Sequence, residues 1–214
     1  MQLLLGTTGS NCTASLPVQN DRLTVQLLLG MTGSSYPPPR STCSHVSGPS
    51  HIYPDTCFEL SALRGILCTT VDPRGRKLNK KQLKHVKKLK KEGKEDPALQ
   101  WGSHVSGLFG QKFFSESEGI PLRSRVRLII GLHPDQATEH IVDVGLEEGM
   151  DFAILPCCVF PIQGGSMDFG EWVEYLMSKD SGIKKEYLSC DGKNLVLYKK
   201  GEKGERRAVI NSDL

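Results

Sequence analysis

The sequence predicts an α/β protein with a mostly parallel sheet, and the segment from Arg125 to Pro161 gives the main reason. Two short apolar runs, at 126–131 and 152–155, have the length and composition of strands that are buried on both faces. Between them, apolar residues recur at helical spacing from 137 to 148. A strand, a helix and a strand this closely spaced predict a right-handed parallel crossover.

Local signals mark the ends of this central helix. Asp135 follows Pro134 and is expected to cap the helix N-terminus, because a short polar side chain at that position accepts backbone N–H groups. Gly149 is expected to end the helix. Upstream, 67–71 reads as a strand that closes on Asp72 and Pro73.

The last third of the chain predicts a helix and an antiparallel pair. Ser166 is expected to cap a helix that extends through Met177 and presents one apolar stripe to the core. The segments 187–190 and 194–198 are strand-like and are separated by Asp191-Gly192, a dipeptide typical of hairpin turns. The mostly parallel sheet is therefore expected to end in an antiparallel C-terminal hairpin.

The N-terminal segment differs in composition from the rest. The stretch QLLLGTTGS at 2–10 returns as QLLLGMTGS at 26–34, and a segment rich in Pro, Ser and Gly follows. The run at 25–29 before Gly30 and Gly33 is compatible with a strand that feeds a phosphate-cradling loop, but no helical pattern follows it. We therefore expect a disordered or artefactual leader at 1–56, a domain at 57–199 and a flexible tail at 200–214.

Composition narrows the setting of the protein. The net charge is only +3, and no apolar run approaches the length of a membrane span. The 7 cysteines are odd in number, which argues against a closed disulfide framework and favours a reducing, intracellular compartment, cytoplasmic or nuclear. The sequence does not indicate an oligomeric state.

Polar residues stand where the strands of the central unit end. Ligands of open α/β sheets bind outside the carboxyl ends of parallel strands, so these residues are expected to face one crevice. They are His133, Pro134 and Asp135 after the first strand, and Pro156, Cys157 and Cys158 after the second.

Each member of this set has a structural alternative. His133 and Asp135 are candidates for acid–base chemistry, although the capping role of Asp135 is favoured. Cys157 and Cys158 are candidate nucleophiles or metal ligands, but adjacent residues of a strand point to opposite faces and no third ligand is evident. We therefore expect packing and pocket lining from the two cysteines, and no metal site.

Two further features point to ligands. Asp72, at the end of a strand, is placed to accept hydrogen bonds from ribose hydroxyls, or else it caps a turn before Pro73. The segment 74–94 predicts a lysine-rich helix, which offers phosphate contacts to a nucleic acid or is a solvated face. The candidate contacts are Lys80, Lys81, Lys84, Lys87 and Lys88.

Three segments carry a resemblance to a known family: FELSALRGILCTTVDPRGRKLNKKQ, GSHVSGLFGQKF, and GLHPDQAT with the later PCCVFP. Over roughly 58–198 the chain resembles poorly characterised, Rossmann-like S-adenosylmethionine-dependent methyltransferase domains. It is more distantly similar to tRNA methyltransferase-type domains, which makes RNA the expected substrate class. The resemblance implies a seven-stranded sheet whose last strand is antiparallel.

Carried over by position, the resemblance assigns locations in the expected site. Asp72 matches the acidic strand end that holds the cofactor ribose, and His104 with Val105 falls near the adenine. The 133–135 corner lies beside the methyl group and the substrate, with His133 as proton acceptor and Asp135 as an orienting group, and 156–158 lines the same pocket. A non-catalytic nucleic-acid-binding protein with the same fold is the alternative.

The chain departs from the family pattern before Phe58. A first strand and a glycine-rich loop are expected there, and the chain has SGPSHIYPDTC instead. Either an altered gene model or splice form has replaced the strand, or the repeat at 25–34 supplies a remote substitute, or the cofactor is no longer bound. The first explanation is favoured, so the sheet is expected to lack its first strand.

Overall fold

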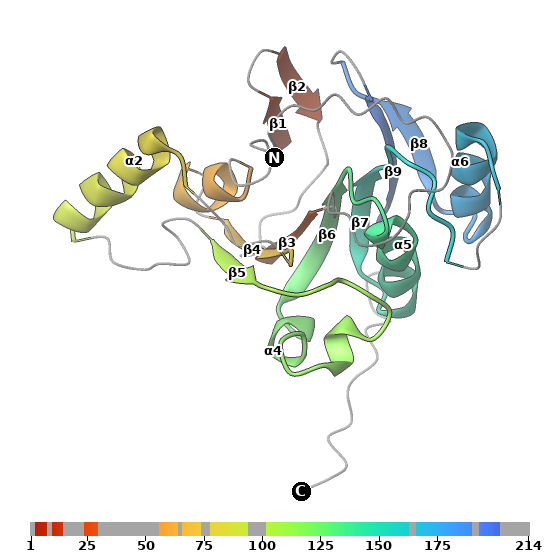
Figure 1. Cartoon of the computed structure of the whole chain (residues 1–214), viewed down its shortest axis with the longest axis horizontal. Coiled ribbons are helices and arrows are strands. Elements are labelled where there is room, and N and C mark those ends of the chain that lie inside the picture. Colours follow the sequence, from red (N-terminus) through yellow and green to blue (C-terminus); the bar gives the residue numbers. More distant parts are fainter. Residues whose placement is uncertain are drawn as a thin grey trace, which may run out of the picture.

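In the computed structural model, a seven-stranded sheet runs through the protein and packs against helices (Figure 1). The structure describes residues 56–63, 66–73, 78–93, 102–162, 166–189 and 193–201, and the backbone of 3–7, 10–14 and 24–29. The strands of the large sheet are β3 (Thr24–Leu29), β4 (Leu67–Val71), β5 (Ser103–Val105), β6 (Val126–Leu132), β7 (Asp151–Leu155), β8 (Lys184–Tyr187) and β9 (Leu195–Lys199). A separate two-stranded sheet consists of β1 (Leu3–Thr7) and β2 (Ser10–Ala14). The helical elements are η1 (Glu59–Leu63), α2 (Lys80–Lys91), η2 (Phe113–Ser115), α4 (Ile120–Arg123), α5 (Ala137–Glu147) and α6 (Phe169–Ser178).

The strand order of the large sheet is β5-β4-β3-β6-β7-β9-β8. Every pair from β5 to β7 is parallel, whereas β9 is antiparallel to both of its neighbours. The predicted α/β class, with a mostly parallel sheet and an antiparallel pair at its C-terminal end, is therefore confirmed. The sheet also has the seven strands, with the last one antiparallel, that the sequence resemblance implies.

The prediction that the sheet lacks its first strand is wrong. β3 lies at the centre of the sheet and pairs in parallel with β4 on one side and β6 on the other, so that Gln26 is opposite both Thr69 and Ile129. This strand comes from the second copy of the N-terminal repeat, inside the segment expected to be a leader. The other parts of 1–55, apart from β1 and β2, lie outside the described residues, as does 202–214 of the expected tail.

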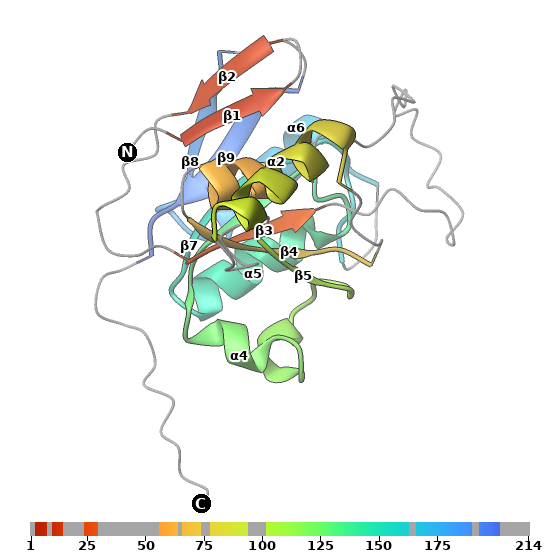
Figure 2. The same cartoon turned by 90° about the vertical axis from the view of Figure 1, so that its left-hand side faces the viewer.

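Helices pack on both faces of the sheet. On one face, α5, α6 and the turn around Phe113 cover a cluster that includes Ile129, Phe152 and the fully buried Trp172. On the other face, η1 and the turn before it pack over a second cluster that includes Cys68. Figure 2 shows η1 and α2 on the side of the sheet opposite to α5. The sheet therefore forms the middle layer. Because β3 to β7 are parallel, their carboxyl ends lie at a common edge of this layer.

Two boundaries in the last third differ from the sequence prediction. α6 is capped by Asp168 rather than Ser166, because Asp168 and Glu171 form a reciprocal capping box. The outer strand of the C-terminal hairpin, β8, ends at Tyr187, where the sequence predicted it to begin. The predicted turn dipeptide lies outside the described residues.

The lysine-rich segment forms α2, which begins with a capping box between Asn79 and Gln82. Its packed side is narrow, since Val86 and Gln82 are buried while Leu83 is 44% exposed. Among the described residues, no helix is both long and apolar enough to cross a lipid bilayer.

Candidate functional site

The carboxyl ends of the parallel strands meet at one edge of the sheet, as expected for neighbouring parallel strands. The backbone N–H of His133, after β6, donates to the carbonyl of Leu155 at the end of β7, at 3.1 Å. The backbone N–H of Asp72, after β4, donates to the carbonyl of Val105 at the end of β5, also at 3.1 Å. These bonds hold the predicted residues in two corners on either side of β3.

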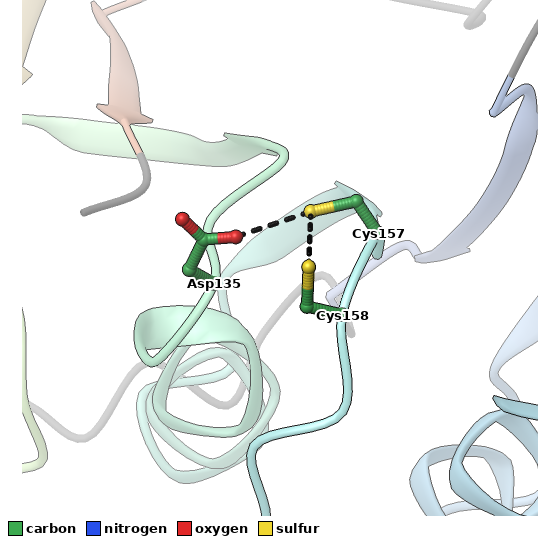
Figure 3. A group of neighbouring side chains, drawn as sticks. All are labelled: Asp135, Cys157 and Cys158. Atoms are coloured by element: carbon green, nitrogen blue, oxygen red, sulfur yellow. Dashed lines mark hydrogen bonds between the residues drawn. The ribbon is translucent and has the colours of Figure 1, made fainter. Parts of the chain in front are cut away.

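The corner after β6 and β7 brings Asp135, Cys157 and Cys158 together (Figure 3). The Cys157 thiol donates to Asp135 Oδ1 at 3.1 Å, and the two sulfur atoms are 3.5 Å apart. The expectation that the cysteines point to opposite faces is wrong, because alternation holds only within a strand and β7 ends at Leu155. Both cysteines follow the strand, where the chain has already turned.

The 133–135 turn has an unusual backbone. His133 and Asp135 have φ values of 52° and 45°, in the left-handed region that non-glycine residues rarely adopt. The predicted N-cap role of Asp135 is wrong, since α5 begins after Gln136 and the Asp135 carboxylate instead accepts the Cys157 thiol. The Asp135 carbonyl accepts from the backbone N–H and the hydroxyl of Thr138, which ties the turn to α5. Such strain is typical of functional sites.

The electrostatics of this corner favour a neutral His133 imidazole and a protonated Cys157 thiol. Burial lowers the pKa of His133, and the positive charge of Lys193 lowers it further, while the negative charge of Asp135 acts in the opposite sense. The hydrogen bond to Cys158, burial and the negative charge of Asp135 together raise the pKa of the Cys157 thiol. A neutral imidazole can accept a proton near neutral pH, whereas a protonated thiol is a poor nucleophile.

A buried carboxylate holds the loop that follows the cysteines. Glu139 is only 2% exposed and lies in the first turn of α5. It accepts from the backbone N–H of Ile162 at 2.7 Å, the Tyr175 hydroxyl at 2.6 Å and the Lys179 ammonium at 2.8 Å. Lys179 also donates to Asp143 at 2.7 Å. The loop after Cys158 is thereby fixed against α5 and α6.

Of the other predicted residues, Pro134 and Pro156 belong to this corner, and the rest lie apart from it. Asp72, 4% exposed, and the adjacent His104–Val105 lie on the β4–β5 side, two strands away from β6, or about 10 Å across the sheet. Pro134 is buried within the strained turn, and Pro156 directly precedes Cys157. The five predicted lysines are all exposed on α2.

Sequence reasoning missed two residues of the site. Lys193 donates to the carbonyl of Cys157 at 3.0 Å and has no local pattern that marks it, since it comes from the connection before β9. Glu139 had one usable signal, a glutamate on the apolar face of a predicted helix. A cavity of about 530 Å³ that Glu139, Asp143 and Lys179 help to line runs along α5. Glu139 and Asp143 are each already paired with Lys179.

Comparison with known proteins adds no relative. No protein-family model matches the chain, and no curated protein matches it significantly. The sheet, its carboxyl edge and the residues at that edge are therefore the features that bear on function.

Proposed function

We propose that this protein is an S-adenosylmethionine-dependent methyltransferase with a Rossmann-like domain, and that its substrate is RNA. The observation that supports this most is the central position of β3 in a seven-stranded sheet in which β9 is antiparallel to both of its neighbours. The resemblance implies seven strands with the last one antiparallel, and the large sheet has this number of strands and this orientation of its last strand. It also removes the main objection to the proposal, the missing first strand.

The cofactor is proposed to bind at the carboxyl ends of β3, β4 and β5. In the sequence, Gly30 and Gly33 follow β3 directly, as a loop that approaches the methionine part of the cofactor requires. Asp72 at the end of β4 is proposed to accept hydrogen bonds from the ribose, and His104 with Val105 to lie near the adenine. The backbone bond from Asp72 to Val105 keeps these two strand ends adjacent.

The chemistry is proposed to take place at the 133–135 corner. S-adenosylmethionine supplies a methyl group on a sulfonium, and an oxygen or nitrogen of the substrate attacks it in line. His133 accepts the proton of the attacking atom, because burial keeps its imidazole neutral near pH 7. Asp135 holds the corner through the Cys157 thiol, and the strained turn fixes where the imidazole stands.

We expect the full-length protein to bind S-adenosylmethionine in calorimetry, and the substitution Asp72→Asn to weaken binding by roughly tenfold or more. Loss of a hydrogen bond to a charged group costs about 1.5–3 kcal/mol. The matched control is Asp168→Asn, which removes a carboxylate from the α6 cap, where asparagine is an equally good capping residue. No heat up to millimolar ligand would contradict the proposal, and unchanged affinity in Asp72→Asn would remove Asp72 from the site.

A second candidate function, binding of nucleic acid without catalysis, is favoured by the surface of α2. Seven of its twelve residues are exposed lysines, and among the described residues a salt bridge is seen for Lys88 alone, with Glu92. Closely spaced ammonium groups attract phosphates without regard to base sequence. The same surface would serve a methyltransferase by holding its RNA.

We expect the triple substitution of Lys80, Lys84 and Lys87 by glutamine to weaken binding of single-stranded RNA and to reduce its salt dependence. Each lost phosphate contact should lower the slope of log K against log salt by about 0.7. Fluorescence anisotropy at several salt concentrations measures both quantities. As a control of equal charge, three exposed lysines outside α2 (Lys112, Lys184 and Lys200) are substituted in the same way. Equal losses in the two variants would assign the attraction to net charge rather than to α2.

A further inference from the structure

The corner after β6 and β7 contains a set of side chains with the chemistry of metal ligands. One ligand atom each from Asp135, Cys157 and Cys158 lies within 4.8 Å of the other two. The distances are 3.1 Å from Cys157 Sγ to Asp135 Oδ1 and 3.5 Å between the two sulfurs. Figure 3 shows the two sulfurs next to each other, with the carboxylate pointing at Cys157 from the opposite chain segment.

The framework behind these side chains is rigid. Asp135 is held in its left-handed conformation by the bonds from Thr138 to its carbonyl, and it is 5% exposed. The cysteine segment is held to the same corner by the 133–155 backbone bond and by Lys193 on the Cys157 carbonyl. On its far side, Glu139 fixes the loop through Ile162. Side chains supported in this way bind a metal with little reorganisation.

We propose that Asp135, Cys157 and Cys158 together bind one thiophilic divalent cation, with Zn²⁺ as the representative ion. Thiolate sulfur selects zinc over magnesium or calcium, and a carboxylate oxygen is a regular third ligand. Binding releases the protons of the two thiols to solvent, so that two thiolates and one carboxylate share the charge of the cation. Three protein ligands leave one position for water or a substrate atom, as in catalytic zinc sites.

The neighbouring groups are compatible with a cation at this place. The ammonium group of Lys193 donates to the carbonyl of Cys157 and stands over the Phe169 ring at 4.9 Å. It therefore has other acceptors than the sulfur atoms. The metal site shares Asp135 and Cys157 with the corner proposed for methyl transfer, but its ligands and their geometry do not involve S-adenosylmethionine.

Titration of the full-length protein with Co²⁺, after metal removal and with a reductant present, tests the proposal. Cobalt takes the place of zinc and reports sulfur ligands by a near-ultraviolet charge-transfer band. We expect the band to saturate at one equivalent and to disappear when Zn²⁺ is added. Cys157→Ser and Cys158→Ser should each remove most of the band, and Asp135→Asn should weaken Co²⁺ binding by roughly tenfold or more.

The control variant is Cys12→Ser, which removes a thiol from the separate β1–β2 sheet and should leave the titration unchanged. Circular dichroism on each variant checks that the fold is retained, and Asp135→Glu, which keeps a carboxylate, replaces Asp135→Asn if that variant unfolds. Absence of the charge-transfer band in the unsubstituted protein, or a band that survives the double substitution of Cys157 and Cys158, would overturn the proposal. Since no cofactor is present, failure here leaves the calorimetric test of S-adenosylmethionine binding intact.

Discussion

Deletion of residues 1–30 is expected to abolish the cooperative unfolding transition of the protein, whereas deletion of residues 1–20 should leave it in place. The longer deletion removes β3, which bonds to β4 on one side and to β6 on the other. Two rows of backbone groups in the middle of the sheet would lose their partners. The summed cost exceeds the roughly 5–15 kcal/mol by which a domain is stable. Thermal melts followed by circular dichroism measure the difference.

A matched pair of substitutions makes the same comparison in the full-length chain. Leu27 lies in the middle of β3, and Leu4 lies in β1, in the other copy of the repeat, one residue after the position equivalent to Leu27. Proline lacks the N–H that a central strand needs, so Leu27→Pro should cost about 3 kcal/mol or more. Leu4→Pro affects the separate β1–β2 sheet and should change the melting temperature of the domain little. A domain that melts equally well in both proline variants would mean that β3 does not belong to the sheet.

The sequence could not identify β3 because its signal is duplicated. The same five residues, QLLLG, occur at 2–6 and at 26–30, and both copies form strands. One copy pairs with the chain a few residues further on, in an antiparallel hairpin. The other pairs in parallel with strands about 40 and 100 residues away. The local sequence cannot predict which partner each copy pairs with, because the pairing depends on distant strands that only the folded sheet brings together.

The elements predicted well have strong local signals that tertiary packing does not oppose. β4 was predicted with its observed bounds, and β6, α5 and β7 to within a residue or two at each end. They carry uninterrupted apolar runs or clear helical spacing, which the buried positions of Ile129, Ile141 and Phe152 satisfy. The sequence was therefore sufficient to predict where these strands end and which residues follow them at the edge of the sheet.

The geometry within the corner could not be predicted. A short polar side chain before a helical pattern is the usual sign of a cap, but the left-handed turn directs the Asp135 carboxylate to Cys157 instead. The alternation rule likewise failed for the cysteine pair, because it depends on where β7 ends. Both errors concern one or two backbone angles, which composition and periodicity do not predict. They are also the two features on which the candidate metal site depends.

Substitution of the buried Glu139 is expected to have the second largest effect on stability. Glu139→Ala would leave the Lys179 ammonium with the Asp143 carboxylate and would deprive Tyr175 and the Ile162 N–H of their acceptor. Breaking a buried ion pair by removing one partner costs about 3–5 kcal/mol. At about 2–4 °C per kcal/mol for a domain of this size, the melting temperature should fall by roughly 10 °C. Asp143→Asn, which removes the more exposed partner of Lys179, is the control and should cost less.

The pH dependence of stability gives an independent test of the same group. Burial by itself would raise the pKa of Glu139, but the donors from Ile162, Lys179 and Tyr175 outweigh burial, and the pKa lies below its ordinary value of 4.5. A carboxyl whose pKa is lower in the folded state stabilises the fold fully above its unfolded pKa. That contribution is lost as the pH falls below about 4.5 and through the lower folded value. In urea unfolding at a series of pH values, Glu139→Gln should therefore show a shallower loss of stability on acidification than the unsubstituted protein. Parallel curves for the two proteins would mean that Glu139 does not change protonation on unfolding, and that the three donors do not hold it as a carboxylate.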